Sequence, residues 1–409
     1  MTSNARHAGF VPLGTIGGFT LIELLIVIGV LAVLSVAVVI ALNPAELLKQ
    51  SRDAVRLSDL AILNRAIGIV GTEDVVNLGS ASTIYVSLPD TSPICANVGL
   101  PAPPSGWTYN CVTNANLRLI SGSGWLPINF PSFTGGAPFS ALPVDPVNTA
   151  ASGLYYAYVT GGSYALTGAL ESNKHLAASA LPDGGTDAGR VELGTDINLW
   201  TQASGLSVYW KFDEGSGTTA GDSSGGNVQG SFVGSPQWVN GKVGKALDFN
   251  GTADYVWAPN SSRIHPAIFT VMAWVKFEGG SLNRTVMGTR KTNFLGDPQG
   301  YSLDALTLNW SFAVGDTSQA VSQISGGGAP TSTWTHIVGV YDGFTMTLYK
   351  NGIALASASS SYVFANSDFR VAARITTPVQ YLSAVIDEVR IYNRPLSATE
   401  IQGYYNATR

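Results

Sequence analysis

Charged side chains are scarce in this sequence: Asp, Glu, Lys and Arg together make up 12% of its 409 residues. The formal net charge at pH 7 is −5, and no block of Lys or Arg stands out. Proteins that attract nucleic acid electrostatically carry a basic patch or stripe, so the composition argues against nucleic acid as a partner. The 46 glycines, with abundant Ser, Thr and Asn, are instead typical of a β-rich extracellular surface.

Cysteine and histidine are also rare. Four scattered histidines and two cysteines give almost no support for a zinc site. Cys95 and Cys111 both follow the apolar N-terminal stretch described below, so they can face an oxidising compartment. We predict a disulfide between them, which would stabilise the fold by about 3 kcal/mol. The alternative is two free thiols.

Signatures of several enzyme classes are missing as well. No H-E-x-x-H motif and no phosphate-binding loop occurs. Glycosidases need two carboxylates about 5 to 9.5 Å apart, and their usual strand pattern E-x-D-x-x-E does not occur either. The acids Asp213-Glu214 and Asp387-Glu388 are adjacent pairs, whose side chains would point to opposite faces of a strand. We therefore predict that the chain is not an enzyme.

The sequence is richest in apolar residues at its N-terminus. From Leu24 to Leu42, only Gly29 and Ser35 interrupt an apolar run of about the 20 residues needed to cross a bilayer core. Glu23 lies at its start. A charge in hydrocarbon costs at least about 2.5 kcal/mol unless it is paired, so Glu23 needs a partner. A secretory signal peptide has a shorter apolar core with its cleavage site behind it, whereas here the small residues come first.

The residues Gly18-Phe19-Thr20-Leu21-Ile22-Glu23, followed by this apolar run, resemble the N-terminus of the type IV pilin family, which includes the pseudopilins of type II secretion. The resemblance implies that a prepilin peptidase cleaves after Gly18 and that Phe19 becomes the methylated N-terminus. Glu23, then the fifth residue, would pair with the free amine of a neighbouring subunit. The alternatives are an ordinary signal peptide and a plain membrane anchor.

Residues 1–18 would be the prepilin leader, and its basic residue Arg6 predicts that it stays in the cytoplasm. We predict a transmembrane and amphipathic helix over residues 19–70, kinked or restarted at Pro44 with Asn43 as its cap. Beyond Pro44, apolar residues at helical spacing predict one dry face, with the charged residues mostly on the opposite, solvated face. The apolar set is Leu48, Val55, Leu60, Ile62, Leu63, Ile67 and Val70, and the charged set is Glu46, Lys49, Arg52, Asp53, Arg56 and Asp59.

Residues 71–204 predict a pilin-like α+β head with a small antiparallel sheet, a tail and a linker at residues 201–205. Strands are expected over residues 82–88 and in a hairpin over residues 153–171, which resembles the closing hairpin of pseudopilin heads. Major pseudopilins hold calcium in this region. The acids here are too sparse to predict such a site; they are Asp145, Glu171, Asp183 and Asp187.

Residues 205–409 change to short strands with turn signals. Alternation of apolar and polar residues predicts strands over residues 269–277 and 334–340. Asn351-Gly352, which lies between two such runs, predicts a tight hairpin because both residues tolerate positive φ. About 200 residues of this pattern predict an all-β sandwich of two sheets.

Several segments of this module resemble the laminin-G-like, concanavalin A-like jelly-roll family; they are Tyr209–Gly217, Asp222–Gly225, Gly244–Gly251, Trp334–Gly343 and Ile386–Ser397. The resemblance implies recognition of a carbohydrate or a protein, commonly with a calcium ion. Asp222 and Asp387, with Asn227 as a further carbonyl ligand, are the candidates for such an ion, since calcium prefers oxygen donors from loops. The alternatives are that Asp222 caps a turn and that Asp387 pairs with an arginine.

Aromatic residues and one histidine of the module have two interpretations each. Trp238, Trp257 and Trp310 would stack on sugar rings if they are exposed and fill the core if they are not. His336 alternates with apolar residues, and we interpret it as a packed, hydrogen-bonded core residue rather than a catalyst.

These features predict a minor type IV pilin-like subunit whose C-terminal domain binds a carbohydrate or protein ligand for adhesion or surface recognition. The precursor would cross the cytoplasmic (inner) membrane once, with its globular part outside the cytoplasm, and the mature form would join a pilus or pseudopilus. Its partners would be the prepilin peptidase, other pilin or pseudopilin subunits, the membrane and the ligand. One alternative is a type II secretion pseudopilin that contacts exported cargo, and another is a membrane-tethered glycan-active enzyme.

Overall fold

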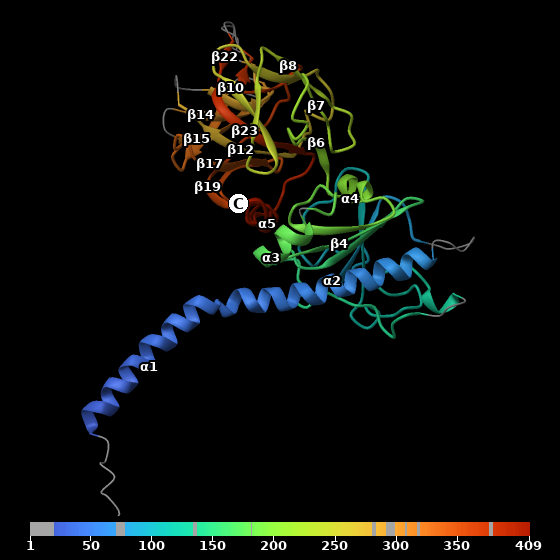
Figure 1. The fold of residues 1–409 in the computed structure, drawn as a ribbon. Coiled ribbons are helices and arrows are strands. Elements are labelled where there is room, and N and C mark those ends of the chain that lie inside the picture. The colour runs from blue at the N-terminus through green and yellow to red at the C-terminus, as the bar shows by residue number, and fades with distance from the viewer. Residues whose placement is uncertain are drawn as a thin grey trace, which may run out of the picture. The chain divides into compact units, whose positions relative to one another are not determined.

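The computed structural model describes residues 20–70, 78–133, 137–180, 182–279, 284–291, 299–306, 309–316, 320–375 and 379–409, without the side chains of residues 36–42 and 70. It consists of two compact units, Met1–Lys49 and Gln50–Arg409, and Figure 1 shows its helices and strands. Gly18 and Phe19, the predicted processing residues, lie outside the described residues.

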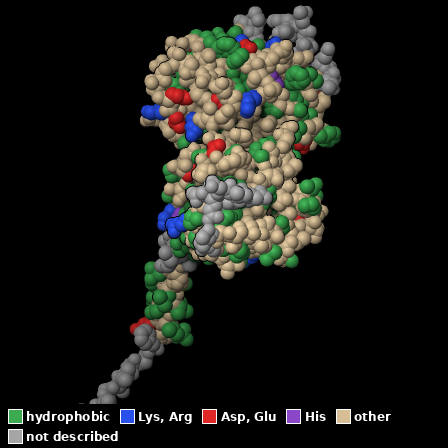
Figure 2. Space-filling view, turned by 90° about the vertical axis from the view of Figure 1, so that its right-hand side faces the viewer, with side chains coloured by type: hydrophobic (Ala, Val, Ile, Leu, Met, Phe, Trp, Pro, Cys, Tyr) green, Lys and Arg blue, Asp and Glu red, His purple; other side chains and the backbone are tan. Residues whose placement is uncertain are grey.

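Helix α1 (Leu21–Leu42) forms where the apolar run predicts it. A capping box closes its first turn: Thr20 Oγ1 accepts a hydrogen bond from the Glu23 amide (3.3 Å), and Glu23 Oε2 accepts one from the Thr20 amide (2.9 Å). Large apolar side chains along α1 are exposed, and Figure 2 shows hydrophobic groups over this helix. Among the side chains that the structure describes, which end at Ser35 in α1, no helix is long and apolar enough to span a membrane.

Asn43 separates α1 from α2 (Pro44–Val70), which confirms the predicted restart of the helix. Its backbone is left-handed, with φ at +41°, and this conformation interrupts the helical path. Its side-chain Oδ1 accepts a hydrogen bond from the Glu46 amide at 3.4 Å. Asn43 therefore caps the second helix, as expected.

From Gln50 on, α2 packs on a sheet with the strand order β2-β1-β3-β4-β5. The β1–β2 pair is parallel and the others are antiparallel, and β3 and β4 form the predicted hairpin. Leu60, Leu63 and Ile67 of α2 are fully buried against this sheet. The strands are β1 (Thr83–Pro89), β2 (Thr108–Val112), β3 (Tyr156–Thr160), β4 (Tyr164–Ala169) and β5 (Arg190–Gly194).

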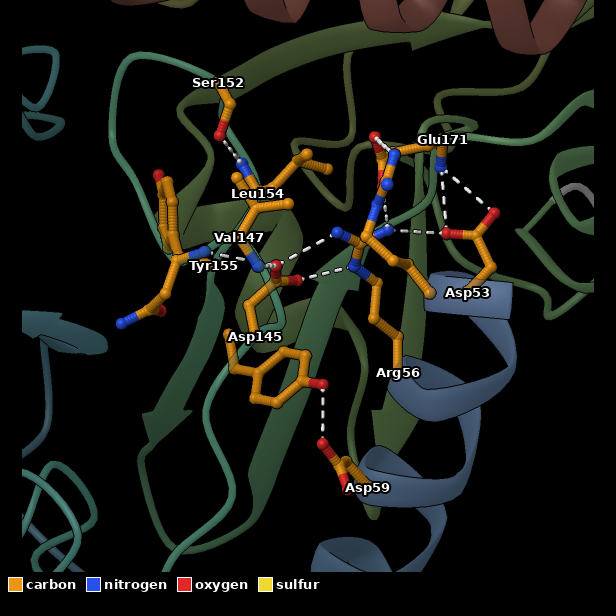
Figure 3. A network of polar contacts seen from close by, with 12 residues as sticks. Asp53, Arg56, Asp59, Asp145, Val147, Ser152, Leu154, Tyr155 and Glu171 are labelled. Carbon is orange, nitrogen blue, oxygen red and sulfur yellow. Dashed lines mark hydrogen bonds and ion pairs between the residues drawn. The ribbon is translucent and has the colours of Figure 1, made fainter. Parts of the chain in front are cut away.

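Two charged residues of α2, Asp53 and Arg56, are buried against the same sheet, contrary to the predicted solvated face, whereas the other four of that set are partly exposed. Arg56 is fully buried and forms ion pairs with Asp145 (Nε–Oδ2, 2.6 Å), Asp53 (Nη1–Oδ1, 2.7 Å) and Glu171 (Nη1–Oε2, 2.6 Å), as Figure 3 shows. Asp53 also accepts hydrogen bonds from the amides of Glu171 and Ser172. Buried charges are tolerated when each is paired and hydrogen-bonded. This network joins α2 to the turn before β3 and to the end of β4.

Apolar residues occupy the solvent side of α2 instead. Leu48, Val55, Ile62 and Ile69 recur every seven residues along the helix and are 44 to 62% exposed. We call these four residues the α2 stripe. The prediction of a single dry face is therefore wrong, because apolar residues lie on two faces of α2 and only one of them contacts the sheet.

Shorter elements complete the head. The Cys95–Cys111 disulfide forms, with the two Cα atoms 5.2 Å apart, which confirms the predicted pair. The expected linker instead includes the end of a helix, and Thr201 and Ala203 are buried there. The short helices are η1 (Phe130–Ser132), α3 (Asn173–His175), η2 (Leu176–Ala180) and α4 (Asn198–Ala203).

The chain from Leu206 onward folds into two packed sheets, which confirms the predicted sandwich. The first sheet has the order β19-β18-β17-β12-β23-β10-β9, with β6 paired to β23, and the second has the order β16-β15-β14-β13-β20-β11-β8-β7. The predicted hairpin forms at Asn351-Gly352, where φ is +51° and +81°.

The strands of the first sheet are β6 (Leu206–Trp210), β9 (Gln237–Asn240), β10 (Lys245–Asn250), β12 (Phe269–Phe277), β17 (Trp334–Tyr341), β18 (Thr345–Lys350), β19 (Ile353–Ser359) and β23 (Ser383–Tyr392). Those of the second are β7 (Thr219–Ala220), β8 (Gly230–Val233), β11 (Tyr255–Ala258), β13 (Arg284–Gly288), β14 (Tyr301–Leu306), β15 (Asn309–Gly315), β16 (Val321–Gly326) and β20 (Phe369–Val371). A separate pair consists of β21 (Ala373–Arg374) and β22 (Gln380–Tyr381).

The head and the sandwich share a hydrophobic core. Tyr209, Trp274 and Val338, which face away from the centre of the sandwich, belong to the same buried cluster as Leu60 and Tyr156 of the head. The first sheet therefore has no free outer face at these positions. Its outer side is an internal surface of the unit Gln50–Arg409.

Two arginines, one on β23 and one just after it, also connect the sandwich to the head; we call this contact region the joint. Arg390 Nη1 donates to the carbonyl oxygen of Thr186, and Arg394 Nε donates to that of Ser204, both at 2.5 Å. The C-terminal helix α5 (Ala398–Thr408) follows and contributes buried residues to the shared core. The joint thus combines apolar packing with buried, charge-assisted hydrogen bonds.

Candidate functional site

The predicted calcium residues lie in hydrogen-bonded turns. Asp222 Oδ1 accepts hydrogen bonds from the amides of Tyr209 (3.0 Å) and Ser224 (2.9 Å), and its Oδ2 accepts one from the amide of Val228 (2.9 Å). Asp222 thus caps a turn, which was the alternative interpretation. Asn227 in the same turn is exposed and has a left-handed backbone with φ at +58°.

The segment around Asp222 also fits a catalytic pattern. Residues Gly221-Asp222-Ser223-Ser224-Gly225 read G-x-S-x-G, the nucleophile motif of many serine hydrolases. In those enzymes the serine lies on a sharp turn between a strand and a helix. Here the segment connects β7 to β8, two strands of one sheet. The context of a nucleophile elbow is therefore missing.

Asp387 lies against a different turn. It is fully buried on β23, and its Oδ2 accepts hydrogen bonds from the amides of Lys242 (2.8 Å) and Val243 (2.9 Å), between β9 and β10. Burial raises the pKa of Asp387 to about 8, with a further contribution from the charge of Glu388. The carboxyl group therefore favours its protonated form near neutral pH, and that form is a poor cation ligand.

Calcium binding stays a prediction on this geometry. The hydrogen bonds assign Asp222 and Asp387 to separate turns. Across the described ranges, no group of three or more His, Cys, Asp or Glu side chains is arranged to hold a metal ion. The expectation of calcium rests on the family resemblance alone.

The outer side of the second sheet, which faces away from the sandwich core, is polar but buried at its centre, where Ser302 and Asp304 are at most 1% exposed. In β14, Tyr301 and Leu303 enter the sandwich core, so Ser302 and Asp304 project from the opposite side of the strand. The strand register aligns one row of residues across the sheet, small in its middle and large towards β11. The members of this central row are Gln323, Ala313, Ser302, Gly288, Arg370, Trp257 and Ser231.

Asp304 is fully buried in this face and is held by four side chains. Thr285 Oγ1 donates to Oδ1 (2.6 Å), and Ser302 Oγ donates to Oδ2 (2.7 Å). Arg374 Nη2 donates to Oδ1 (3.0 Å), and Arg290 Nη2 donates to Oδ2 at 3.4 Å. Although burial alone would raise the pKa of Asp304, the two arginines and the hydroxyl groups hold it below its usual value. Asp304 is therefore an ionised and fixed group.

Aromatic side chains flank the Asp304 cluster. Trp257 is half-buried and pairs in register with Arg370 of β20. The guanidinium carbon of Arg370 lies 5.1 Å from the ring centre of Tyr255, and the rings of Tyr255 and Tyr381 are 6.2 Å apart. Tyr381 also lines a pocket of about 350 Å³ together with Asn250, Gly251, Glu278, Gly279, Arg284 and Ser383.

The three tryptophans named as possible sugar-stacking residues lie in different environments. Trp310 is fully buried in the sandwich core, and Trp238 packs on Phe232 with ring centres 5.6 Å apart. Trp257 is the one that joins the polar face. His336 is fully buried, with its ring centre 5.3 Å from that of Trp274, which confirms its core position. The expected hydrogen bonding is wrong, because neither ring nitrogen has a hydrogen-bond partner among the described residues.

Sequence reasoning misses the arginines of this face. The alternation in Tyr301-Ser302-Leu303-Asp304 indicates that Asp304 leaves the core. It does not reveal the partners, because Arg290 and Arg374 are 14 and 70 residues away from Asp304 in the chain. Nothing in the local sequence marks either of them as its neighbour.

Comparison with known families gives one match. Residues 250–402 match the model of the concanavalin A-like lectin/glucanase superfamily. No curated protein shows significant similarity to the sequence. The matched region includes most strands of the sandwich, and β6 to β9 and all but the last residue of β10 precede it.

Several solved structures resemble about half of the chain. One is the binding domain of Paraclostridial mosquitocidal protein 1, with 16% identity and a TM-score of 0.42 over 49% of this chain and 52% of that chain. Another is domain 4 of AbnA, a GH43 extracellular arabinanase from Geobacillus stearothermophilus solved with arabinotriose, with 23% identity and a TM-score of 0.40 over 48% of this chain and 96% of that chain.

A third is the receptor binding domain of a botulinum neurotoxin C/D mosaic serotype, with 15% identity and a TM-score of 0.41 over 49% of this chain. The chain spans about half the length of the toxin domains that it resembles. Residues 250–402 form a concanavalin A-like jelly-roll domain.

Proposed function

We propose that the chain is a membrane-inserted subunit of a type IV pilin-like filament, whose C-terminal jelly roll binds a carbohydrate or protein ligand at the cell surface. The observation that carries the binding role is the polar outer face of the second sheet, where Trp257 lies beside Arg370 near the Asp304 cluster. A flat aromatic ring next to fixed polar groups suits a sugar, because sugar rings combine apolar faces with hydroxyl edges.

Asp304 supports binding rather than hydrolysis. Glycosidases use two carboxylates, one of which transfers protons while the other attacks or activates water. Asp304 is locked by four hydrogen-bond donors and has a lowered pKa. Among the described residues in the strands of the second sheet, it is the one acid. A membrane-tethered glycan-active enzyme is therefore the weaker alternative.

The α2 stripe supports the filament role. Its members, Leu48, Val55, Ile62 and Ile69, are exposed on one side of α2 while the opposite side packs on the head. Apolar residues repeated every seven positions form a seam that packs against another helix. The exposed apolar side chains of α1 extend the same chemistry towards the N-terminus. Neighbouring subunits of a filament would cover both surfaces.

Glu23 has two successive partners in this proposal. In the uncleaved chain it completes the capping box with Thr20. Cleavage after Gly18 would create a free amine on Phe19 close to this helix terminus, and assembly would then offer Glu23 the amine of a neighbouring subunit. Both partnerships lower the cost of placing a carboxylate next to an apolar run.

Assembly is tested by producing the full chain in a bacterium that has a prepilin peptidase. We expect a mature protein that begins at methylated Phe19 by mass spectrometry. We also expect Glu23→Ala to be cleaved but excluded from filaments, while Glu46→Ala is cleaved and assembled. Absence of cleavage after Gly18 would contradict the pilin role. Filaments on the cell surface indicate a pilus; processed protein without surface filaments indicates the pseudopilin alternative.

Ligand binding is tested with the detergent-solubilised full chain on an array of glycans and surface proteins, in calcium and in chelator. We expect Trp257→Ala to weaken binding at least about tenfold, since a stacked aromatic is a typical binding hot spot. Trp238→Ala, which removes a partly buried tryptophan from the first sheet, should leave binding unchanged. Equal loss in both variants, or in neither, argues against this face as the site. Loss of binding in chelator alone would establish calcium dependence.

A further inference from the structure

Positive charge is concentrated beside the central row. Arg290 and Arg374 share Asp304, and Gly288, two residues before Arg290, pairs in register with Arg370. The backbone of Lys291 forms an isolated parallel β-bridge with Ile375, the residue after Arg374. Among the described residues, the three arginines form ion pairs with two acids, Asp304 and Asp368. The whole chain carries a net charge of −5, so this excess is local.

Asp304 cannot neutralise both arginines that contact it. Arg290 is 7% exposed, its ion pair with Asp304 is 3.4 Å long, and its Nε has no hydrogen-bond partner among the residues that the structure describes. Burial lowers the pKa of Arg290, and the charge of Arg374 lowers it further. A buried cation with incomplete pairing costs free energy, and an added anion would reduce that cost.

Arg370 places a second incompletely paired cation next to the aromatic residues. Its Nε is buried without a hydrogen-bond partner in the described ranges, and its ion pair with Asp368 is 3.5 Å long. It lies over the Tyr255 ring and opposite Trp257 in register. A sugar stacked on Trp257 would therefore bring its substituents close to the Arg370 guanidinium group.

We propose that this face selects saccharides that carry an anionic group, a carboxylate or a sulfate, with Arg370 and Arg374 as the residues that recognise it. The proposal rests on the glycan-binding role above and deepens it. Guanidinium groups bind planar anions through paired, charge-assisted hydrogen bonds. Arg374 keeps 13% of its side chain exposed and Arg370 keeps 16%, so a ligand can reach both.

The test measures binding of the detergent-solubilised full chain to three polymers: polygalacturonate, its methyl-esterified form and dextran sulfate. We expect polygalacturonate or dextran sulfate to bind at least about tenfold more tightly than the neutral ester. Binding of polygalacturonate would identify a carboxylate as the recognised group, and binding of dextran sulfate would identify a sulfate. Binding should weaken as salt rises, because salt screens exposed charges.

Two variants and one control locate the effect. Arg370→Gln and, independently, Arg374→Gln should each lower binding of the anionic polymer about tenfold and leave the neutral ester unchanged. Arg65→Gln, on the exposed side of α2, removes the same charge elsewhere and should change nothing. Circular dichroism checks that each variant is folded.

The outcomes separate this inference from the proposed function. Equal binding of the acid and the ester, with Trp257 still required, overturns the anion preference and preserves the glycan-binding role. An equal effect of Arg65→Gln and Arg370→Gln also overturns it, because the attraction would then be unspecific. Failure of the folded chain to bind any glycan overturns both.

Discussion

At the scale of single residues, the most constrained group is Arg56. It lies on a helix surface whose local sequence predicts solvent, yet it is fully buried among three carboxylates (Figure 3). Burial alone would lower the pKa of Arg56, but the hydrogen bonds and charge of Asp145, Glu171 and Asp53 raise it above its ordinary value. Arg56 is therefore the central cation of a network that joins helix to sheet.

We predict that Arg56→Met destabilises the head by about 3 to 5 kcal/mol, because it leaves Asp53 and Asp145 buried without a counter-charge. Urea denaturation of the full chain in detergent measures the loss. Arg65→Met removes an exposed arginine from the same helix and should change the free energy of unfolding by less than about 0.5 kcal/mol. Equal stability of the two variants would show that the network contributes nothing.

Glu192 makes stability depend on pH. Burial raises its pKa to about 8, and the charge of Asp187 contributes further. An unfolded glutamate has a pKa of about 4.3, so between those values the folded chain holds the extra proton. The contribution of Glu192 to stability is therefore full below about pH 4 and is lost as pH rises through about 8.

We predict that Glu192→Gln reduces the fall in stability between pH 5 and pH 8 by about 1 to 3 kcal/mol. Denaturation curves of both proteins across that range provide the measurement. Glu214, which is exposed, supplies the matched control variant Glu214→Gln, with a smaller expected effect. Parallel pH profiles for the parent and Glu192→Gln would refute the assignment.

At the scale of elements, α2 has two apolar faces, one packed on the head and one exposed. Leu60, Leu63 and Ile67 hold it on the head, while the α2 stripe lies on the solvent side. In a soluble monomer, such a row of exposed apolar residues usually marks a binding surface. The stripe is the feature of the described structure that best matches helix-to-helix assembly.

We predict that Ile62→Lys blocks filament assembly without unfolding the head. Ile62 is 44% exposed and lysine is a good helix former, so the free energy of unfolding should change by less than about 0.5 kcal/mol. A charge in an apolar helix seam, however, opposes packing. Electron microscopy of cells counts the filaments, and Ala61→Lys, an exposed position outside the stripe, is the matched control. Normal filaments with Ile62→Lys would remove the stripe from the interface.

Local rules predict most elements correctly. The Asn43–Pro44 break, the β3–β4 hairpin, the Asn351-Gly352 turn and the alternation in β12 each follow from a few neighbouring residues. Features that depend on distant partners are missed. Arg52 and Glu171 are 119 residues apart, and Arg374 and Asp304 are 70 apart. A charge looks solvated in a local window because its neutralising partner lies outside that window.

At the scale of the molecule, the joint between head and jelly roll makes the two parts one packed unit. The expected linker is packed instead of exposed. Tyr209, Trp274 and Val338 of the first sheet are buried in the same hydrophobic cluster as residues of the head. Arg390 and Arg394 add hydrogen bonds to Thr186 and Ser204 across the joint. The two parts therefore depend on each other for the burial of apolar surface.

We predict that a fragment of residues 205–409 is poorly soluble, because it exposes Met272, Trp274, Val338 and Val340, which are buried in the full chain. A fragment of residues 50–409 keeps them covered and should remain monomeric. Size-exclusion chromatography with dye binding compares the two. A monomeric 205–409 fragment without dye binding would show that the shared core is dispensable.

The packed joint also has a mechanical consequence. If a filament is fixed at its base while a ligand pulls on the second sheet, tension must cross from jelly roll to head. It crosses through the backbone between α4 and β6, and through the Arg390–Thr186 and Arg394–Ser204 contacts beside it. Bonds loaded side by side share the force, whereas bonds in a slack linker take it one after another. The subunit would then act as a stiff strut that transmits load, rather than as a tether that absorbs it.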